Sequence, residues 1–419
     1  MATPAARLAV VSAHASPTAS LGRSANGGMT VYIRQVCNAF AARGIESDIF
    51  TRKTGPDDPD MECFEPRCRV IYLAAGPPGL DKGALAKHIP EFAESLVRHL
   101  QADPDRYDLI YSHYWLSGWA ALLARREVDK LWLHTAHTLA AVKNRNLAQG
   151  DRLEPELRLS KERQIARNCD RLICHTAAER QVLMDEYGAQ GSRVEVVAPG
   201  VNLEEFHPLD RALAKSKVGY PNGRLAIFVG RLERLKGAEL FLRAGASLET
   251  DPGLRLLIIG DDSSDDPRRS ERKRLQRVAK QLGIDHMVDF LGPVAQSELI
   301  YYYNAADVLV MPSYSESFGL VGLEAQACGC PVIAPRVGGL ADIVRHGVNG
   351  YLVESNSPQE YSGHLTEVLR APRLREEMGV KAALLAQRYP WSATAERLLD
   401  VVCDQLDRVR AKRICAGQD

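Results

Sequence analysis

Short apolar runs alternate along this chain with amphipathic stretches, and this alternation limits the possible folds more than any other feature. In the first half, the runs typical of buried strands are Arg7–Ser12, Ser47–Thr51, Arg69–Ala74, Tyr107–Tyr111, Leu131–His134, Arg171–His175 and Val194–Val197. In the second half they are Leu225–Val229, Leu254–Gly260, Met287–Leu291, Asp307–Met311, Pro331–Ala334 and Gly350–Val353. Strands separated by helices predict parallel, doubly wound α/β sheets with ligands at the carboxyl ends of the strands.

The chain length and a turn-rich segment predict two domains. The expected helices are Gly28–Phe40, Ala84–Leu100, a short helix from Ser117, Glu154–Asn168, Lys236–Ser247, Pro267–Leu282, Leu340–Arg345 and a terminal helix at Ala393–Arg410. A chain of 419 residues is long for one core. The segment Pro199–Pro208 carries turn residues at both ends and reads as a linker. We therefore predict two Rossmann-like domains, residues 1–200 and 201–392, that face each other across a cleft.

Composition narrows the possible ligands. The 53 basic and 53 acidic residues balance, which leaves no electrostatic footprint for nucleic acid or an anionic membrane. No apolar run approaches the ~20 residues that span a bilayer, and Leu8–Val11 is too short for the core of a signal peptide. The nine cysteines lack metal-ligand spacing and read as reduced thiols. We expect a cytoplasmic protein with a small-molecule site.

A Ser- and Gly-rich turn between two expected strands opens a short helix over residues 313–329. Backbone N–H groups near Ser317 and Gly319 would point out of the helix N-terminus, which is an anion site. Glu316 and Glu324 would lie roughly 12 Å apart, on broadly the same side. This arrangement suits a sugar nucleotide, and two solvated glutamates are the plain alternative.

Two further glycine-containing loops have the chemistry to approach a diphosphate. Gly27 and Gly28 precede the first expected helix, and glycine has no Cβ to keep a phosphate away from the backbone. Gly230 comes just after the expected strand Leu225–Val229 and is followed by Arg231 and Lys236, whose charges can neutralise a diphosphate. A simple tight turn and a solvated charged loop are the respective alternatives.

Polar side chains also gather at two strand ends of the first half, in Ser112–Gly118 and His134–Asn144. Two histidines and two threonines within five positions are hard to assign to a core. We predict functional roles for His134 and Thr135, whereas for His137 a structural role is equally open.

The motif E-S-F-G-L-V-G-L-E-A-Q-A-C-G-C-P-V resembles the E-x7-E signature of the retaining glycosyltransferases of GT-B fold, and G-R-L-E-R-L-K-G resembles their G-R-L-x-x-x-K-G motif. The resemblance implies that Glu316 contacts the transferred sugar and Glu324 the ribose, while Arg231 and Lys236 stabilise the leaving nucleoside diphosphate. The donor-binding residues so implied are Gly27, Gly28, Gly230, Ser317, Phe318, Gly319, Leu320, Glu324 and Val294. It also implies that the terminal helix, about residues 393–419, braces the first domain, although its spacing alone would allow a homodimer contact.

The first half resembles the D-inositol-3-phosphate glycosyltransferases of mycothiol biosynthesis. The segments that carry this resemblance are S-A-H-A-S-P, G-G-M-T-V-Y-I, A-A-G-P, S-H-Y-W-L-S-G and H-T-A-H-T-L-A-A-V-K-N. It implies transfer of N-acetylglucosamine from UDP-GlcNAc to inositol phosphate, with His134 positioning sugar and acceptor hydroxyls. The implied acceptor-binding residues are Lys82, Tyr114, Thr135, Arg158, Thr30 and His14.

Two departures from that pattern leave other acceptors open. Thr30 stands where asparagine is common, and Asp261 follows Gly260 where a second glycine is usual. Sucrose-phosphate synthases, aminocyclitol glycosyltransferases, a phosphorylase or epimerase of similar fold, and a regulatory protein that binds nucleotide sugars are the alternatives. Because no carboxylate is placed to act as a covalent nucleophile, we expect leaving-group stabilisation to dominate a retaining transfer. Protein cations would take the role of a metal, so we expect no obligatory divalent ion or other cofactor.

Overall fold

The computed structural model describes residues 6–18, 27–80, 82–249, 251, 253–262 and 270–416; the side chains of Lys82 and of residues 409–416 lie outside this description. The strands of the first half are β1 (Arg7–Val11), β2 (Glu46–Arg52), β3 (Met61–Glu65), β4 (Cys68–Leu73), β5 (Leu109–His113), β6 (Leu131–Thr135), β7 (Arg171–Cys174) and β8 (Val194–Val196). Those of the second half are β9 (Arg224–Val229), β10 (Leu254–Ile259), β11 (Val288–Gly292), β12 (Val308–Val310), β13 (Val332–Pro335) and β14 (Gly350–Val353).

The helices fill the intervals between the strands, as the alternation predicts. In the first half they are α1 (Gly28–Ala41), α2 (Lys82–Leu85), α3 (Ile89–Ala102), α4 (Tyr114–Ala124), α5 (Ala140–Arg145), α6 (Glu156–Asn168) and α7 (Ala177–Tyr187). The second half contains α8 (Arg211–Lys217), α9 (Ala238–Ala246), α10 (Glu271–Gln281), α11 (Gln296–Ala305), α12 (Leu320–Ala327), α13 (Leu340–Ile343), α14 (Pro358–Arg370) and α15 (Pro372–Ala386), and α16 (Trp391–Ala416) ends the chain.

Each half is built on one twisted sheet, which confirms the predicted α/β class. The strand orders are β3-β4-β2-β1-β5-β6-β7-β8 and β11-β10-β9-β12-β13-β14. Every pairing is parallel except that of β3 with β4. In both sheets the first strand sits where the order reverses, next to β5 in the first and β12 in the second, and ligands of open α/β sheets bind at the carboxyl ends of such strands.

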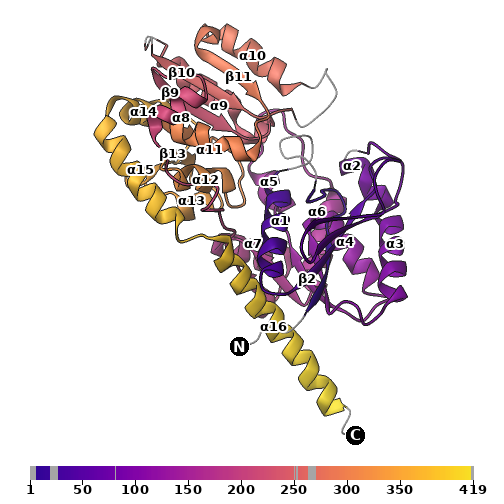
Figure 1. Cartoon of the computed structure of the whole chain (residues 1–419). Coiled ribbons are helices and arrows are strands. Elements are labelled where there is room, and N and C mark those ends of the chain that lie inside the picture. The colour runs from indigo at the N-terminus through magenta and orange to yellow at the C-terminus, as the bar shows by residue number, and fades with distance from the viewer. Residues whose placement is uncertain are drawn as a thin grey trace.

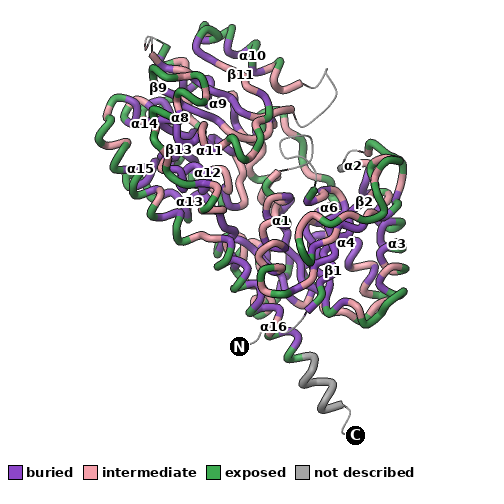
Figure 2. The backbone as a smooth tube through the Cα atoms, viewed as in Figure 1, coloured by how far each residue is buried: buried purple, intermediate pink, exposed green. Residues whose placement is uncertain are grey.

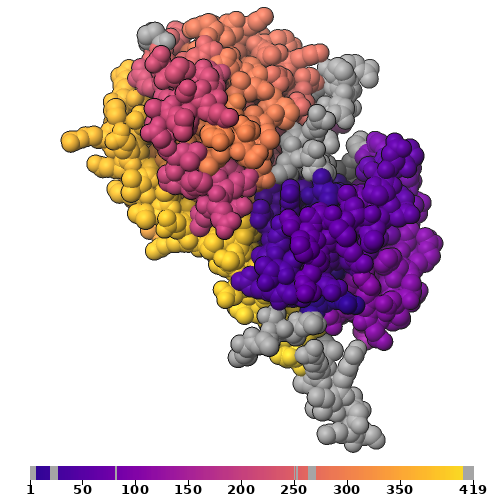
Figure 3. Space-filling model, viewed as in Figure 1, coloured from indigo at the N-terminus to yellow at the C-terminus, as the bar shows by residue number. Residues whose placement is uncertain are grey.

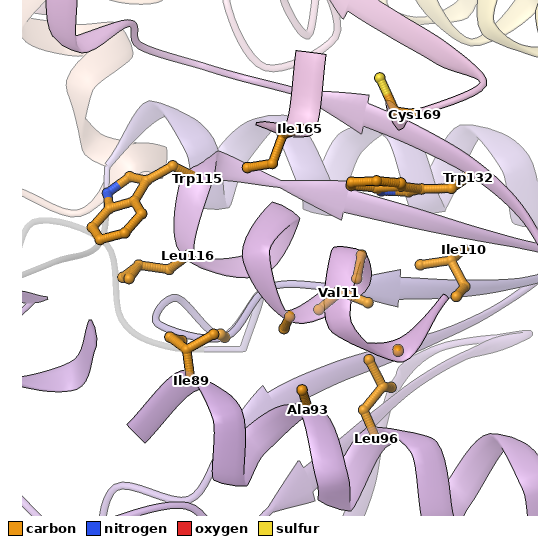
Figure 4. Packing of buried hydrophobic residues seen from close by; sticks show 14 of the residues in the cluster. Val11, Ile89, Ala93, Leu96, Ile110, Trp115, Leu116, Trp132, Ile165 and Cys169 are labelled. Carbon is orange, nitrogen blue, oxygen red and sulfur yellow. The ribbon is translucent and has the colours of Figure 1, made fainter. Parts of the chain in front are cut away.

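Buried residues concentrate on the strands and on the helix faces that cover them (Figure 2). In the first half, Ile89 and Leu96 of α3, Leu116 of α4 and Ile165 of α6 pack in one cluster with Trp132 of β6 (Figure 4). Trp132 is fully buried, and its indole N–H donates to the Ser112 hydroxyl at 2.7 Å. This cluster holds α4 and α6 against the sheet, and these helices carry two of the predicted acceptor residues.

The two halves meet along one side; α15 lies on the second half, and α16 continues from the junction along the first (Figures 1 and 3). The chain crosses between the halves twice, and the crossings lie side by side: Val201 N donates to the Tyr389 carbonyl at 2.7 Å, and the Thr394 hydroxyl donates to the Ala198 carbonyl at 2.9 Å. Beyond the second crossing α16 packs on α1, with the Trp391 and Tyr32 rings 5.7 Å apart. The apolar residues at the start of α16 are therefore buried against the first half.

Several elements differ from those the sequence predicts. β3 was not predicted because it is a short edge strand in which no residue is buried. α4 begins at Tyr114 instead of Ser117, since Tyr114 has a φ of 71° and turns the chain directly from β5 into the helix. The stretch after the linker forms α8, whose first turn is capped by the Asp210 carboxylate. Helices α5, α7, α11, α14 and α15 also went unpredicted.

Candidate active site

Lys236 and Glu316 meet at the carboxyl edge of the second sheet, where β9 and β12 lie side by side. The Lys236 Nζ donates to Glu316 Oε2 at 2.6 Å. Gly237 has a φ of 73°, and a Cβ at this position would lie 2.0 Å from the Pro312 carbonyl oxygen. Only glycine therefore lets the Lys236 loop pack this closely on the segment after β12.

The backbone of the turn that carries Glu316 packs against two glycines that follow β13, Gly338 and Gly339. A Cβ at Gly338 would lie 1.7 Å from the Glu316 carbonyl oxygen, and Gly339 N donates to the Ser317 carbonyl at 3.0 Å. Gly319, with a φ of 98°, begins α12 as its N-cap residue. The predicted strand, turn and helix are thus present, and the turn is fixed by backbone contacts.

Glu324 lies on α12 with 8 % of its surface exposed. The Tyr303 hydroxyl of α11 donates to its Oε2 at 3.0 Å. Burial raises the pKa of Glu324 to about 8, and the hydrogen bond from Tyr303 offsets only part of this rise. A carboxyl group kept neutral in a buried position can both donate and accept hydrogen bonds.

The glycine loop of the first half lies against the cationic loop and α12 of the second. A Cβ on Gly27 would lie 3.7 Å from Arg231 Nε, and one on Gly28 would lie 3.3 Å from Leu320 Cδ1. The Arg231 Nη1 pairs with Glu233 at 2.8 Å. The structure therefore brings residues from four distant segments of the sequence to one place.

The other second-half residues predicted to bind the donor follow strands of the same sheet. Gly230 follows β9 and is packed so closely that a Cβ on Gly260 would lie 1.9 Å from its carbonyl oxygen. Phe318 is buried, with its ring 6.5 Å from His175 and 5.8 Å from Tyr389. Val294 is half-buried and follows β11, the edge strand two places from β9.

On the first half, three of the predicted acceptor residues converge at the switch point of the sheet. The Tyr114 ring lies 4.7 Å from the His14 ring and 4.9 Å from the Arg158 guanidinium carbon. Arg158 is 1 % exposed; its Nε donates to Glu162 at 2.7 Å and its Nη2 to the Thr138 hydroxyl at 2.9 Å. Tyr114 is one of three non-glycine residues with positive φ among those described, which is typical of functional sites.

His134 and Thr135 do not join this group. Successive side chains of a strand point to opposite faces of the sheet. His134 and Thr135 are therefore on opposite faces of β6, and both are buried. His134 Nδ1 lies 2.9 Å from the Ser112 hydroxyl, under α4, and burial lowers its pKa to about 3. The Thr135 hydroxyl lies 2.8 Å from that of Tyr111 on the other face. The structure therefore places both predicted residues among the packed side chains behind the strand ends.

The second His-Thr pair, three residues later, lies where the halves touch. His137 has a φ of 60°, its Nε2 is 3.0 Å from His113 Nδ1, and its carbonyl accepts a hydrogen bond from the Ser317 hydroxyl. Burial, together with the neighbouring histidines, lowers the pKa of His137 well below its usual range. Thr138 contacts Arg158, as described above. The sequence shows two His-Thr pairs, His134-Thr135 and His137-Thr138. It does not show that β6 ends at Thr135, so that only the second pair lies beyond the strand.

Thr30 and Lys82 complete the predicted acceptor set. Thr30 lies in the first turn of α1, and its buried hydroxyl has no hydrogen-bond partner within the described parts of the chain. The side chain of Lys82, at the start of α2, lies outside the described residues. A buried hydroxyl beside the glycine loop is available to a ligand.

Comparison with known proteins agrees with this geometry over nearly the whole chain. The model described as Glycosyltransferase Family 4 matches residues 26–205, and the one described as Glycosyl transferases group 1 matches residues 210–384. A D-inositol 3-phosphate glycosyltransferase of Nocardiopsis dassonvillei is 42% identical over 403 residues, or 94% of each chain. The chain belongs to the glycosyltransferases of GT-B fold.

Solved structures of other GT-B glycosyltransferases superpose on the chain. Sucrose-phosphate synthase from Thermosynechococcus elongatus has a TM-score of 0.90 and is 33% identical, with 96% of this chain and 100% of that one covered. The Anabaena protein HepE in complex with UDP and glucose has a TM-score of 0.76 at 18% identity, covering 95% of this chain and 100% of its own. The second likeness concerns the fold alone. In the part of the glycosyltransferase that the structure describes, no helix is long and apolar enough to cross a membrane.

Proposed function

We propose that this glycosyltransferase transfers N-acetylglucosamine from UDP-GlcNAc to 1D-myo-inositol 3-phosphate in the cytoplasm, with retention of anomeric configuration. The observation that carries the proposal is the 42% identity to a D-inositol 3-phosphate glycosyltransferase, which extends over 94% of both chains and includes the acceptor half. Similarity of fold alone would not identify the acceptor, because one fold serves many different functions.

In this proposal the halves divide the two substrates between them. Residues 201–392 bind the donor, with Glu316 on the transferred sugar and Glu324 on the ribose. Residues 1–200, together with the helix over about 393–419, bind the acceptor. The grouping of Tyr114, Arg158 and His14 supports this assignment, because a buried guanidinium beside a tyrosine suits a compact phosphate.

The chemical step rests on stabilising charge that develops on the leaving diphosphate. Arg231, Lys236 and the backbone N–H groups of Gly27 and Gly28 would act on it, and one such donor is typically worth ~10²–10³ in rate. Lys236 is already paired with Glu316, so the cation and the sugar-binding carboxylate hold each other in place. The acceptor hydroxyl would attack from the face that the diphosphate leaves, which retains configuration.

The placement of His137 changes one assignment. We propose that His137, and not His134, contributes to substrate positioning, since its carbonyl meets the Ser317 hydroxyl of the donor turn. Likewise Thr138, which contacts Arg158, replaces Thr135 as the hydroxyl beside the acceptor phosphate.

A second candidate is transfer of glucose from UDP-glucose to fructose 6-phosphate. It is favoured by the 33% identity and the TM-score of 0.90 to a sucrose-phosphate synthase. Both candidates use a phosphorylated acceptor, so the site geometry does not separate them.

A crossed substrate panel tests the proposal. UDP-GlcNAc, UDP-glucose and GDP-mannose are each combined with inositol 3-phosphate, fructose 6-phosphate and an unphosphorylated cyclitol, and release of nucleoside diphosphate is measured. We expect the highest kcat/KM for UDP-GlcNAc with inositol 3-phosphate, and proton NMR of that product should show the anomeric configuration of the donor. Preference for fructose 6-phosphate would favour the second candidate, and an inverted product would exclude retention.

A further inference from the structure

Two cations of the acceptor half share a single carboxylate. Glu154, in the segment between α5 and α6, pairs through Oε1 with Lys143 Nζ and through Oε2 with Arg158 Nη1, the latter at 3.0 Å. Its side chain is 19% exposed, whereas that of Arg158 is 1% exposed. Glu154 therefore covers the guanidinium on the side that leads outward from the buried cluster.

The other sides of the Arg158 guanidinium are already occupied. Its Nε is held by Glu162, its Nη2 donates to both the hydroxyl and the carbonyl of Thr138, and its face rests on the Tyr114 ring. An anion that binds Arg158 must therefore use Nη1, which Glu154 holds. The same anion would reach Lys143, because Glu154 bridges the two cations.

The two carboxylates on Arg158 differ in how firmly they are held. Glu162 is 5% exposed and also accepts hydrogen bonds from Ala140 N at 3.0 Å and from the Tyr187 hydroxyl at 2.8 Å. The backbone of Glu154 is fixed, since its N–H donates to Asn144 Oδ1 at 2.7 Å. Within the described residues, the Glu154 carboxylate pairs with the two cations. The Glu154 side chain can turn away while its backbone stays.

We propose that Glu154 is an exchangeable counter-ion, which the phosphate of the acceptor displaces from Arg158 and Lys143, and that Lys143 is thereby a further ligand of that phosphate. The proposal rests on the proposed function only for the identity of the acceptor. With Glu154 in place, the charges of Lys143, Arg158, Glu154 and Glu162 cancel, so a dianion gains little there. When the Glu154 carboxylate has moved away, the phosphate contacts two cations, Lys143 and Arg158, and the carboxylate of Glu162 remains on Arg158.

The exchange would also select the acceptor. A phosphate dianion can replace a carboxylate because it forms more charge-assisted hydrogen bonds with the same two cations. A neutral alcohol has no charge to offer and would leave Glu154 where it is. Phosphorylated acceptors are then favoured for two reasons: the phosphate is attracted by the two cations, and only a phosphate can compete with Glu154 for them.

Steady-state kinetics of Glu154→Gln test the exchange. We expect the KM for inositol 3-phosphate to fall about tenfold, since one charge-assisted pair no longer competes, while kcat and the donor KM stay unchanged. Lys143→Met should raise the acceptor KM about tenfold, and Lys143→Arg should restore most of the loss. Glu156→Gln is the matched control: its side chain is 77% exposed, two residues from Glu154, and the variant should behave as the wild type.

Calorimetric titration of inorganic phosphate in the presence of saturating UDP gives an answer that needs no acceptor turnover. Phosphate should bind more tightly to Glu154→Gln and more weakly to Lys143→Met than to the wild type. Unchanged or weaker binding to Glu154→Gln would overturn the exchange, even if inositol 3-phosphate proves to be the acceptor. If instead another phosphorylated acceptor is used, the phosphate titration still decides the exchange, and only the proposed function fails. Should Glu154→Gln not fold, Glu154→Asp, too short to bridge both cations, is expected to shift phosphate affinity in the same direction.

Discussion

Replacing Glu324 with glutamine removes a buried ionisable group and keeps its shape, and we expect the variant to be more stable than the wild type at neutral pH. Glu324 accepts a hydrogen bond from Tyr303, and burial raises its pKa from 4.5 to about 8. The glutamine carbonyl can still accept that hydrogen bond. The folded carboxyl group thus holds its proton at a pH where the unfolded chain has lost it.

The size of the effect follows from this difference in pKa. Below pH 4.5 both states are protonated, so Glu324 costs no stability. As the pH rises from 4.5 towards 8 the unfolded state is favoured by about 1.36 kcal/mol per unit, and above 8 the cost stays constant. The free energy of unfolding of Glu324→Gln should therefore exceed that of the wild type by about 1 kcal/mol at pH 5 and by about 3 kcal/mol at pH 7.

Urea unfolding at a series of pH values measures this difference. Glu298→Gln is the matched control, because Glu298 is exposed on α11, the helix that carries Tyr303, and its removal should give no such pH-dependent gain. A variant that is less stable than the wild type at pH 7, or a difference that does not grow with pH, would refute the reasoning.

Four further predictions concern turnover. Lys236→Met should lower kcat about 10²–10³-fold in an assay of UDP release, with little change in acceptor KM; a change confined to KM would argue against leaving-group stabilisation. Gly237→Ala should lower kcat as well, because a Cβ 2.0 Å from the Pro312 carbonyl displaces the Lys236 loop, and normal turnover would contradict the tight packing. His137→Ala should lower turnover more than thermal stability, and His134→Ala the reverse, as circular dichroism melts and kinetics can show. Excess chelator should leave turnover unchanged, and its abolition would indicate an obligatory divalent ion.

Most of the strands could be predicted because each depends on a short stretch of sequence. Buried parallel strands are continuous apolar runs, and strands such as β9 and β10 lie within about a residue of their predicted bounds. The exposed edge strand β3 has no such run, so nothing local distinguishes it from a loop. The local setting of Glu316, Ser317 and Gly319 could be predicted for the same reason, since they belong to one strand, turn and helix.

Only the tertiary structure decided which polar residues of the first half face the second. Whether His134 or His137 leaves the sheet depends on where β6 ends and on a positive φ that the sequence does not announce. The hydrogen bond from Ser317 to His137 joins residues 180 apart in the chain, and the bridge of Glu154 between two cations depends on how α5 and α6 pack. Likewise, the raised pKa of Glu324 comes from burial beneath α11. Local sequence determines elements and turn chemistry, whereas burial and the pairing of distant charges are set by packing that involves the whole chain.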